Sequence, residues 1–547
     1  MSRVALVAMA APSRPESAPL GAASFAAAIA GSASVHILEP RAGEAPAALA
    51  SRILSSGARA VGFSVYSWNR IALSETARAL RRTAPGLALF AGGPEATADP
   101  TGLALEAGLD FVVAGEGEGA AAEVLRIIAR IEEAGDEPPA ARILRSPALE
   151  AADLPSPWIA GILKPGTLHG ELPWELARGC PYACAFCYES KGDRRVRRLP
   201  LERIKAELKL LSRAAAERGG LEVFVLDPTF NAERGRALEL LDLFAAEGGG
   251  IRWKFEIRAE LVDRELAGRF ARLDCSLQIG LQSANPRALA AVGRGLDRKA
   301  FARKTAILGR AGVVFGLDLI YGLPGDCLAD IEESLDWALG LGPNHLDVFP
   351  LALLPGTRLH DEAQELGIRA DPRPPYLATA TNELPEEDFA RAALLAAACD
   401  RYYTKGRAVG WFLAALRPLR MRPSAYLREL ARSAATGVAA PPGAESLVIE
   451  AQHLAALDRL YRAKSLDRAL PALRDIVRFN GAWGRALAEG ISSEFELSYP
   501  YEDIAGPASL DLLLYARSAR PGHCRIVVGP GKDGVEIAAA GRGRKES

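Results

Sequence analysis

The sequence has no long apolar run, no excess of basic residues and no dense set of cysteines. No stretch reaches the roughly 18 apolar residues that a bilayer-spanning helix needs, so we expect no membrane span. Lys and Arg number 66 against 67 Asp and Glu, and this balance does not favour a nucleic-acid partner. Seven cysteines in 547 residues are not typical of a secreted disulfide framework. These features together predict a cytoplasmic protein.

Two local features each have a plain and a functional interpretation. The apolar residues Val4–Ala11 follow Arg3 and could form a short signal peptide, but they fit a first buried strand better. Arginines at positions 194, 195, 197 and 198 form a basic cluster. We interpret it as a solvated stretch or as a phosphate contact beside a site.

The first 136 residues alternate apolar runs with Ala-rich helical segments such as Gly21–Ala30 and Ser74–Thr83. The alternation predicts an α/β domain with a doubly wound parallel sheet, flavodoxin-like or Rossmann-like, covered on both faces. Ligands of such sheets bind at the carboxyl ends of the strands. The expected strands are Val4–Met9, Ser34–Leu38, Ala60–Ser64, Leu87–Ala91 and Asp110–Ala114.

A proline-rich stretch, residues 137–173, is expected to be a linker that partly packs. In residues 174–371 the alternation returns with six β/α units, too few for a closed eight-stranded barrel. We therefore expect a partial (β/α)6 barrel that is open on one side. Its expected strands are Trp174–Ala177, Leu221–Leu226, Arg252–Ile257, Ser276–Leu281, Val313–Ile320 and His345–Leu351.

The remaining residues, 372–547, are predicted to form a mainly helical C-terminal region. Helical patterns cover Glu386–Tyr403 and much of Leu413–Leu487, while Arg517–Ala539 contains an expected strand pair. A polar tail, Gly541–Ser547, ends the chain.

Three cysteines lie within eight residues directly after the first expected barrel strand. Cys180, Cys184 and Cys187 have the spacing Cys-x3-Cys-x2-Cys, which can bring three thiolates to one 4Fe–4S cluster and leave one iron without a cysteine. An open iron can chelate a substrate, as an open zinc position does. A zinc site with His169 as the fourth ligand is one alternative, and chance clustering of buried cysteines is another.

This motif, with Phe186 before the third cysteine, resembles that of the radical S-adenosylmethionine (SAM) enzymes. The resemblance implies a 4Fe–4S cluster whose open iron holds the amine and carboxylate of SAM. It implies that one electron from the cluster cleaves SAM to a 5′-deoxyadenosyl radical, and that Phe186 lies close to the adenine. It also implies an external electron donor such as flavodoxin or ferredoxin, and a small-molecule or peptide substrate.

The resemblance continues at the ends of the later barrel strands. Asp227 ends the second strand, where the family often carries a Gly-Gly-Glu motif that this chain lacks, so only Asp227 can be proposed there. Related enzymes contact the ribose and carboxylate of SAM at the end of the fourth strand. For Glu256 and Arg258, which end the third strand, the alternative to a SAM contact is a buried ion pair that closes the top of the barrel. The SAM contacts implied at the third and fourth strands are Glu256, Arg258, Gln278, Gln282 and Ser283.

The first domain resembles the cobalamin-binding domain that is fused ahead of many radical SAM enzymes. Glycines at strand ends let the backbone approach a large flat ligand, although glycine turns without a cofactor are the alternative. The implied cobalamin contacts follow the third, fourth and fifth strands: Ser64, Tyr66, Gly92, Gly93, Glu95, Gly115, Glu116 and Gly117.

One departure from the cobalamin mutases concerns the cobalt ligand. The chain has no Asp-x-His-x-x-Gly sequence, whose histidine ligates cobalt, and its only histidine before residue 169 is His36. We therefore expect the dimethylbenzimidazole of cobalamin to be detached without a histidine replacing it, and Tyr66 and Trp68 to pack against the corrin.

Together the resemblances imply a cobalamin-dependent radical SAM enzyme, of a subgroup of these fused proteins. The leading reaction is methylation of an unactivated carbon, as by a class B-type methyltransferase. A radical oxidative cyclase or rearrangement enzyme is the alternative, and a sensor that binds a cluster and cobalamin is a further one. Residues 411–547 resemble nothing we can place. Candidate pocket residues are Tyr188, Tyr321, Tyr376, Tyr402 and Tyr403.

Overall fold

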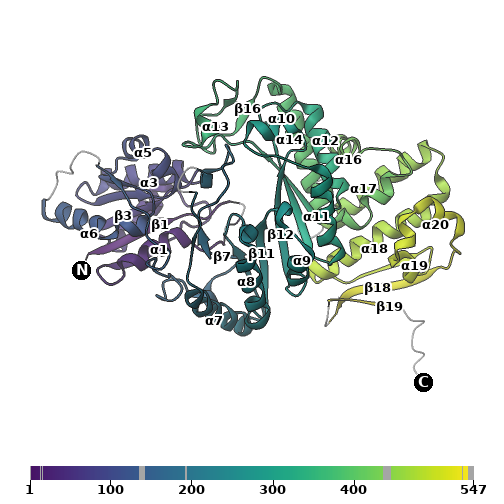
Figure 1. The fold of residues 1–547 in the computed structure, drawn as a ribbon, viewed down its shortest axis with the longest axis horizontal. Coiled ribbons are helices and arrows are strands. Elements are labelled where there is room, and N and C mark those ends of the chain that lie inside the picture. The colour runs from purple at the N-terminus through teal and green to yellow at the C-terminus, as the bar shows by residue number, and fades with distance from the viewer. Residues whose placement is uncertain are drawn as a thin grey trace.

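The computed structural model describes residues 2–12, 14, 16–134, 142–190, 194–434, 445–531 and 534–539. An N-terminal α/β part, a central parallel sheet flanked by helices and a mainly helical C-terminal part follow one another across the molecule (Figure 1). Residues 137–141 of the expected linker and the expected tail 541–547 lie outside the described residues.

The first sheet has six parallel strands in the order β2-β1-β3-β4-β5-β6. The doubly wound prediction is confirmed, but β6 lies in the stretch expected to be a linker. Only Leu144 of its four residues is buried, so this short edge strand has little apolar signal. The strands are β1 (Arg3–Ala8), β2 (Ser34–Leu38), β3 (Ala60–Ser64), β4 (Ala88–Gly92), β5 (Phe111–Ala114) and β6 (Arg142–Arg145).

Helices cover both faces of this sheet and leave its carboxyl edge to the neighbouring part. Phe25 of α1 and Val124 of α6 pack on one face, and Leu49 of α2 and Leu73 of α3 pack on the other. The helices are α1 (Leu20–Ile29), α2 (Pro46–Ser55), α3 (Arg70–Thr83), α4 (Pro94–Ala98), α5 (Pro100–Ala107) and α6 (Gly117–Ala134).

The second sheet also has six parallel strands, in the order β14-β13-β12-β11-β10-β7. Because β14 and β7 lie at its two edges, the sheet is the expected partial barrel. The strands are β7 (Leu172–Trp174), β10 (Leu221–Val225), β11 (Ile251–Ile257), β12 (Cys275–Gln282), β13 (Val314–Tyr321) and β14 (His345–Pro350). The helices are α7 (Leu201–Arg218), α8 (Arg234–Glu247), α9 (Arg264–Phe270), α10 (Pro286–Ala291), α11 (Arg298–Arg310) and α12 (Leu328–Gly340).

The first barrel strand, β7, begins two residues before the expected Trp174–Ala177 and shares only Trp174 with it. It ends at Trp174, and the next residues form β8 (Ala177–Arg178), which pairs antiparallel with β9 (Arg197–Arg198). The cysteine loop connects these two short strands, so both of its ends are held by one small ribbon.

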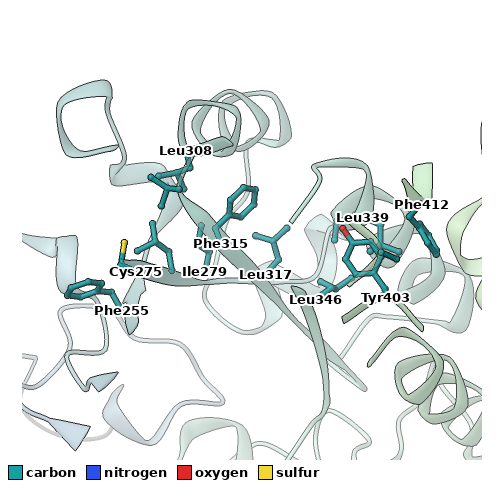
Figure 2. Packing of buried hydrophobic residues seen from close by; sticks show 14 of the residues in the cluster. Phe255, Cys275, Ile279, Leu308, Phe315, Leu317, Leu339, Leu346, Tyr403 and Phe412 are labelled. Carbon is teal, nitrogen blue, oxygen red and sulfur yellow. The ribbon is translucent and has the colours of Figure 1, made fainter. Parts of the chain in front are cut away.

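Alternation along β12 separates an apolar face from a polar one. Cys275 and Ile279 are buried among apolar side chains of the core, with Leu308 of α11 and Phe315 and Leu317 of β13 (Figure 2). The intervening residues Ser276, Gln278, Gly280 and Gln282 therefore lie on the opposite face.

The C-terminal part is mainly helical, as expected, and a π-helical turn over Asp400–Lys405 extends α14. The expected strand pair is part of a three-stranded antiparallel sheet, because β17 joins it. Among the described residues no helix is long and apolar enough to cross a membrane. The elements are α13 (Arg358–Asp361), β15 (Arg369–Ala370), β16 (Ala378–Ala380), α14 (Glu386–Cys399), α15 (Phe412–Leu416), α16 (Pro423–Ala434), α17 (Glu445–Ala463), α18 (Leu470–Glu489), β17 (Ser493–Leu497), α19 (Tyr501–Ala505), α20 (Leu512–Ser518), β18 (Cys524–Gly531) and β19 (Gly534–Ala539).

Candidate active site

The cysteine loop is fixed by backbone hydrogen bonds to two distant segments of the chain. The Ala185 N–H donates to the Val292 carbonyl at 3.0 Å, and the Leu359 N–H donates to the Ala185 carbonyl at 3.0 Å. Cys180 and Cys184 are buried, and Cys187 is half-buried. The loop therefore presents its thiols in a shielded position at the end of the barrel.

The thiols of the loop lie in a shielded environment. The pKa of Cys187 is raised to about 11, mainly by burial, and the nearby Cys184 and Cys180 contribute to the increase. Iron ligation stabilises the thiolates that such an environment disfavours. Within the described residues, no three His, Cys, Asp or Glu side chains are arranged to hold one metal ion. In a 4Fe–4S cluster each cysteine binds a different iron, so the three sulfurs need not meet at one point.

Asp227 lies directly behind the turn that leads into the cysteine loop. One carboxylate oxygen accepts hydrogen bonds from the N–H groups of Leu176 and Ala177, at 2.9 and 3.0 Å. Burial raises the pKa of Asp227 to about 7, although these hydrogen bonds oppose the shift. The observed contacts thus fix the backbone between β7 and β8.

A polar group fills the inner face of the barrel around Gln278. Its amide nitrogen donates to Asp347 at 3.0 Å and to Asp318, and His345 Nε2 lies 2.8 Å from its amide oxygen. Burial raises the pKa of Asp318 to about 8, and the charge of Asp347 contributes to the increase. Glu256 lies beside this group on β11, and burial raises its pKa to about 7.

The other SAM candidates of the third and fourth strands lie in different surroundings. Arg258 stacks over the ring of Tyr182, 3.9 Å from its centroid, and forms an ion pair with Glu260 at 3.1 Å. Gln282 has a left-handed backbone with φ of 73°. Ser283 is buried behind the strand end, where its hydroxyl oxygen accepts a hydrogen bond from the Asn285 N–H at 3.0 Å.

Arg294 belongs to the site although the sequence analysis did not single it out. One guanidinium nitrogen donates to the Gly280 carbonyl at 2.7 Å, and another lies 3.9 Å from Cys184 Sγ. Its Nε is buried without a hydrogen-bond partner among the described residues. Its position between two helices gave no strand-end signal. Phe186 packs against the apolar cluster that includes Tyr321 and Leu323.

A cavity of about 680 Å³ lies between the carboxyl edge of the first sheet and the start of the cysteine loop. Leu6, Phe25, Phe90 and Val113 give it an apolar end. Arg178, Gly179 and Tyr188 border it from the barrel. Of the expected cobalamin contacts, those that line it are Ser64, Tyr66, Gly92, Gly93, Gly115, Glu116 and Gly117.

Two glycines of this cavity have conformations that side chains rarely adopt. Gly93 and Gly115 have φ of 106° and 105°. A Cβ on Gly93 would lie 2.8 Å from the Val65 carbonyl oxygen, and one on Gly115 would lie 2.9 Å from that of Ser146. Both glycines therefore allow neighbouring backbone to close around the cavity.

An ion-pair network forms the wall between the cavity and the cysteine loop. Arg178 contacts Glu116 at 3.0 Å, Glu118 at 2.8 Å and Glu175 at 2.9 Å, and Arg197 contacts Glu116. Arg178 stands two residues before Cys180, so the network ties the end of β5 to the cluster loop. The sequence indicated Arg197 as part of a basic cluster and Glu116 as a cobalamin contact, but it did not predict that the two form an ion pair.

Glu95 lies outside the cavity lining. It is 4% exposed and contacts Arg70 and Tyr376 instead. Tyr66 and Trp68 stack at a centroid distance of 4.4 Å, but only Tyr66 lines the cavity. Of the pocket tyrosines, Tyr402 and Tyr403 are instead buried in the core near the C-terminal part, and Tyr321 packs against Phe389.

Two family models match this chain, that of the radical SAM superfamily over residues 174–338 and that of the B12 binding domain over residues 6–125. The chain thus combines a radical SAM domain with a B12 binding domain, as the two resemblances in the sequence predicted. These domains imply a 4Fe–4S cluster, SAM and cobalamin as cofactors.

Curated relatives share part of the sequence. The uncharacterized methyltransferase PH0819 of Pyrococcus horikoshii is 30% identical over 195 residues, which cover 34% of this chain and 40% of that protein. The cobalamin-dependent radical SAM methyltransferase TokK of Streptomyces tokunonensis is 27% identical over 359 residues, which cover 58% of this chain and 50% of that protein. The chain thus spans about half the length of the curated relatives it matches.

Solved structures share the fold. The radical SAM methyltransferase TsrM from Kitasatospora setae, with tryptophan and a SAM analogue bound, superposes with a TM-score of 0.53 at 17% identity, covering 68% of this chain and 78% of that one. The cobalamin-dependent radical enzyme OxsB with aqua-cobalamin bound gives a TM-score of 0.57 at 13% identity, covering 95% and 85%. The match to OxsB extends over the C-terminal part, for which the sequence alone showed no resemblance to a known family.

Proposed function

We propose that this chain is a cobalamin-dependent radical SAM methyltransferase that methylates an unactivated carbon of a small-molecule or peptide substrate. The cavity carries this proposal, because the strand ends of the cobalamin-binding domain and the approach to the cysteine loop border the same space. A methyl donor and a radical-generating centre must lie close together for such a reaction. The similarity to TokK, a cobalamin-dependent radical SAM methyltransferase, supports the same class.

Different residues hold the cluster and SAM in this proposal. When bound, the cluster supplies the electron that cleaves SAM, and cobalamin supplies the methyl group. Cys180, Cys184 and Cys187 hold the cluster, and Asp227 holds the backbone that leads to them. Arg294 offers a guanidinium beside Cys184 for the carboxylate of SAM.

The polar residues around Gln278 on the inner face of the barrel orient SAM. Gln278 is fixed by Asp318, Asp347 and His345. Glu256 forms no hydrogen bond or ion pair among the described residues, so its carboxyl is available to a ligand. Gln282, Ser283 and Arg258 complete the strand ends, and Phe186 packs near the adenine.

The apolar end of the cavity suits the detached nucleotide base of cobalamin, with Ser64 and Tyr66 at its side. His36 lies on β2 and does not line the cavity. This placement supports a cobalamin whose lower face receives no histidine. Glu116 contributes to the wall toward the cluster.

The proposed reaction also requires a source of electrons, and the cysteine content bears on the cellular compartment. We infer an external electron donor of the flavodoxin or ferredoxin type, because no second cysteine motif in the sequence could hold another cluster. A cytoplasmic location fits the low cysteine content, seven residues in 547.

Anaerobic SAM cleavage tests the proposal. Protein reconstituted with iron and sulfide, loaded with cobalamin and reduced with dithionite should convert SAM to 5′-deoxyadenosine. A variant with all three loop cysteines changed to alanine should keep cobalamin and lose cleavage. A wild-type protein that binds cobalamin and cluster but leaves SAM intact would support the sensor alternative instead.

A further inference from the structure

Arg70 is a buried cation at the boundary between the cobalamin-binding domain and the segment that follows the barrel. Its side chain is 9% exposed. It contacts Glu95 at 3.0 Å, Asp99 at 2.8 Å and Glu106 at 3.0 Å. Three carboxylates around one guanidinium fix its position firmly, because each uses a different nitrogen of the planar group.

Tyr376 completes this group from 306 residues further along the chain. Its hydroxyl accepts a hydrogen bond from Arg70 at 3.2 Å and donates one to Glu95. Arg70 donates to Glu95 with the same nitrogen, so the three side chains form a closed triangle. Burial, followed by the hydrogen bond to Glu95, raises the pKa of Tyr376, which keeps the hydroxyl protonated as a donor.

Tyr376 is itself held in an unusual backbone conformation. Its φ is 60°, in the left-handed region that a non-glycine residue rarely occupies. The backbone is fixed there because the Leu353 N–H donates to its carbonyl at 2.9 Å. Leu353 lies in the segment that leaves β14, so this tyrosine is held by the chain directly after the last strand of the barrel.

In the cobalamin-binding domain, the triangle of Arg70, Glu95 and Tyr376 joins the loops that follow β3 and β4. Both loops border the cavity. Arg70 follows the loop that carries Ser64 and Tyr66, and Glu95 follows Gly92 and Gly93. The Val65 N–H donates to the Gly92 carbonyl at 2.8 Å, and the Glu95 N–H donates to the Val65 carbonyl at 3.2 Å. A displacement of the triangle is therefore transmitted to both loops.

A second contact links the same loop to the cluster. The hydroxyl of Tyr188, the residue after Cys187, donates to the Pro94 carbonyl at 3.1 Å. The segment Gly92–Glu95 thus contacts the cluster loop on one side and the end of the barrel on the other.

We propose that Arg70, Glu95 and Tyr376 are positioning residues that set the distance between the bound cobalamin and the SAM site. This inference rests on the proposed function and deepens it. Glu95 accordingly acts through the β3 and β4 loops and not by touching the corrin. Cobalamin and SAM are held by different domains, so the methyl group must cross the boundary between them. A shift of ~1 Å at this boundary can therefore cost roughly a hundredfold in the rate of methyl transfer.

The test compares two reactions of one protein. SAM cleavage to 5′-deoxyadenosine needs only the barrel, whereas transfer of the SAM methyl group to reduced cobalamin needs both domains. Tyr376→Phe should lower kcat of cobalamin methylation roughly ten- to a hundredfold, with unchanged KM for SAM, unchanged cobalamin affinity and unchanged SAM cleavage. Tyr461→Phe is the matched control, because it removes a fully buried hydroxyl that donates to the Ala415 carbonyl at 2.8 Å.

A second measurement does not depend on activity. In cofactor-free protein, hydrogen–deuterium exchange of the peptide containing Pro94–Ala98 should be faster in Tyr376→Phe than in wild type or Tyr461→Phe. Arg70→Lys should behave like Tyr376→Phe, because an ammonium cannot bridge three carboxylates and a hydroxyl in one plane.

The outcomes separate the two proposals. Wild-type exchange and wild-type methylation in both variants would overturn the positioning role. An equal loss of cleavage and methylation would overturn it too, since that pattern reports general destabilisation. A wild-type protein that binds no cobalamin would instead contradict the proposed function, while the exchange measurement would still decide whether the triangle holds the β4 loop.

Discussion

Gly316 has no side chain at the place where the imidazole of His345 lies. A Cβ on Gly316 would be 1.9 Å from His345 Nε2, and the two residues are paired across β13 and β14. The glycine therefore lets His345 reach Gln278 on the inner face of the barrel.

Gly316→Ala is expected to displace His345 and loosen Gln278. Overpacking at such a site typically costs about 1–3 kcal/mol of folding free energy. Thermal unfolding should show the loss, and isothermal titration should show weaker SAM binding. Gly309→Ala in α11 is the control, because its Cβ meets nothing within 4 Å and should stabilise the helix by about 1 kcal/mol. Wild-type stability in Gly316→Ala would contradict this packing.

Gln278→Ala and Glu256→Ala should each weaken SAM binding. A lost hydrogen bond to a charged ligand typically costs about 1.5–3 kcal/mol, or roughly ten- to a hundredfold in affinity. Titration of SAM into the reconstituted protein measures the change. If both variants bind SAM like wild type, these residues serve the barrel structure and not the ligand.

The stability of the ligand-free protein should fall as pH rises from about 4 toward 8. Burial raises the pKa of Asp318 from its usual 3.8 to about 8, so the folded state holds this proton after the unfolded chain has lost it. Its contribution is therefore present at low pH and is lost as pH rises through this window. Urea unfolding at several pH values should show a smaller decrease in Asp318→Asn. An identical pH slope in the variant would exclude Asp318 as the source.

Changing Cys180, Cys184 and Cys187 to alanine should remove the absorbance near ~400 nm and about four irons per chain. Iron analysis after anaerobic reconstitution measures this. Cys275→Ala should keep the cluster, because Cys275 is buried among apolar side chains of the core (Figure 2). The same is expected for Cys327, Cys399 and Cys524. Zinc without iron after reconstitution would reject the cluster.

Bound cob(II)alamin should show no nitrogen ligand from the protein or from its own base. His36 does not line the cavity, and Tyr66 offers no ready electron pair to cobalt. Electron paramagnetic resonance detects a nitrogen ligand by its superhyperfine splitting. A splitting that disappears in His36→Ala would show that the histidine ligates cobalt after all.

The sequence predicted the two parallel sheets because their strands are apolar runs between amphipathic or Ala-rich helices. It missed β6, whose four residues include two arginines, and β17, which alternates polar and apolar residues at an exposed edge. Both are short strands that owe their pairing to neighbours and carry little apolar signal of their own.

The candidate site was predictable where residues cluster in the chain, as the three cysteines and the strand-end glycines do. It was not predictable where two residues that contact each other are far apart in the sequence. Arg178 and Glu116, Arg70 and Tyr376, and Gly280 and Arg294 meet only after folding. Glu95 shows the same limit, because its position shortly after Gly92 and Gly93 gave no hint of a partner 281 residues away.

The most direct test of the account follows the methyl group itself. Cobalamin-loaded protein with a reconstituted cluster is incubated with a strong reductant and SAM that carries a trideuterated methyl group, and the cobalamin is then analysed by mass spectrometry. Methyl transfer by this protein should give a trideuteromethyl group on cobalamin together with S-adenosylhomocysteine. Unlabelled cobalamin in a protein that still cleaves SAM to 5′-deoxyadenosine would contradict methyl transfer and favour a radical cyclase or rearrangement enzyme.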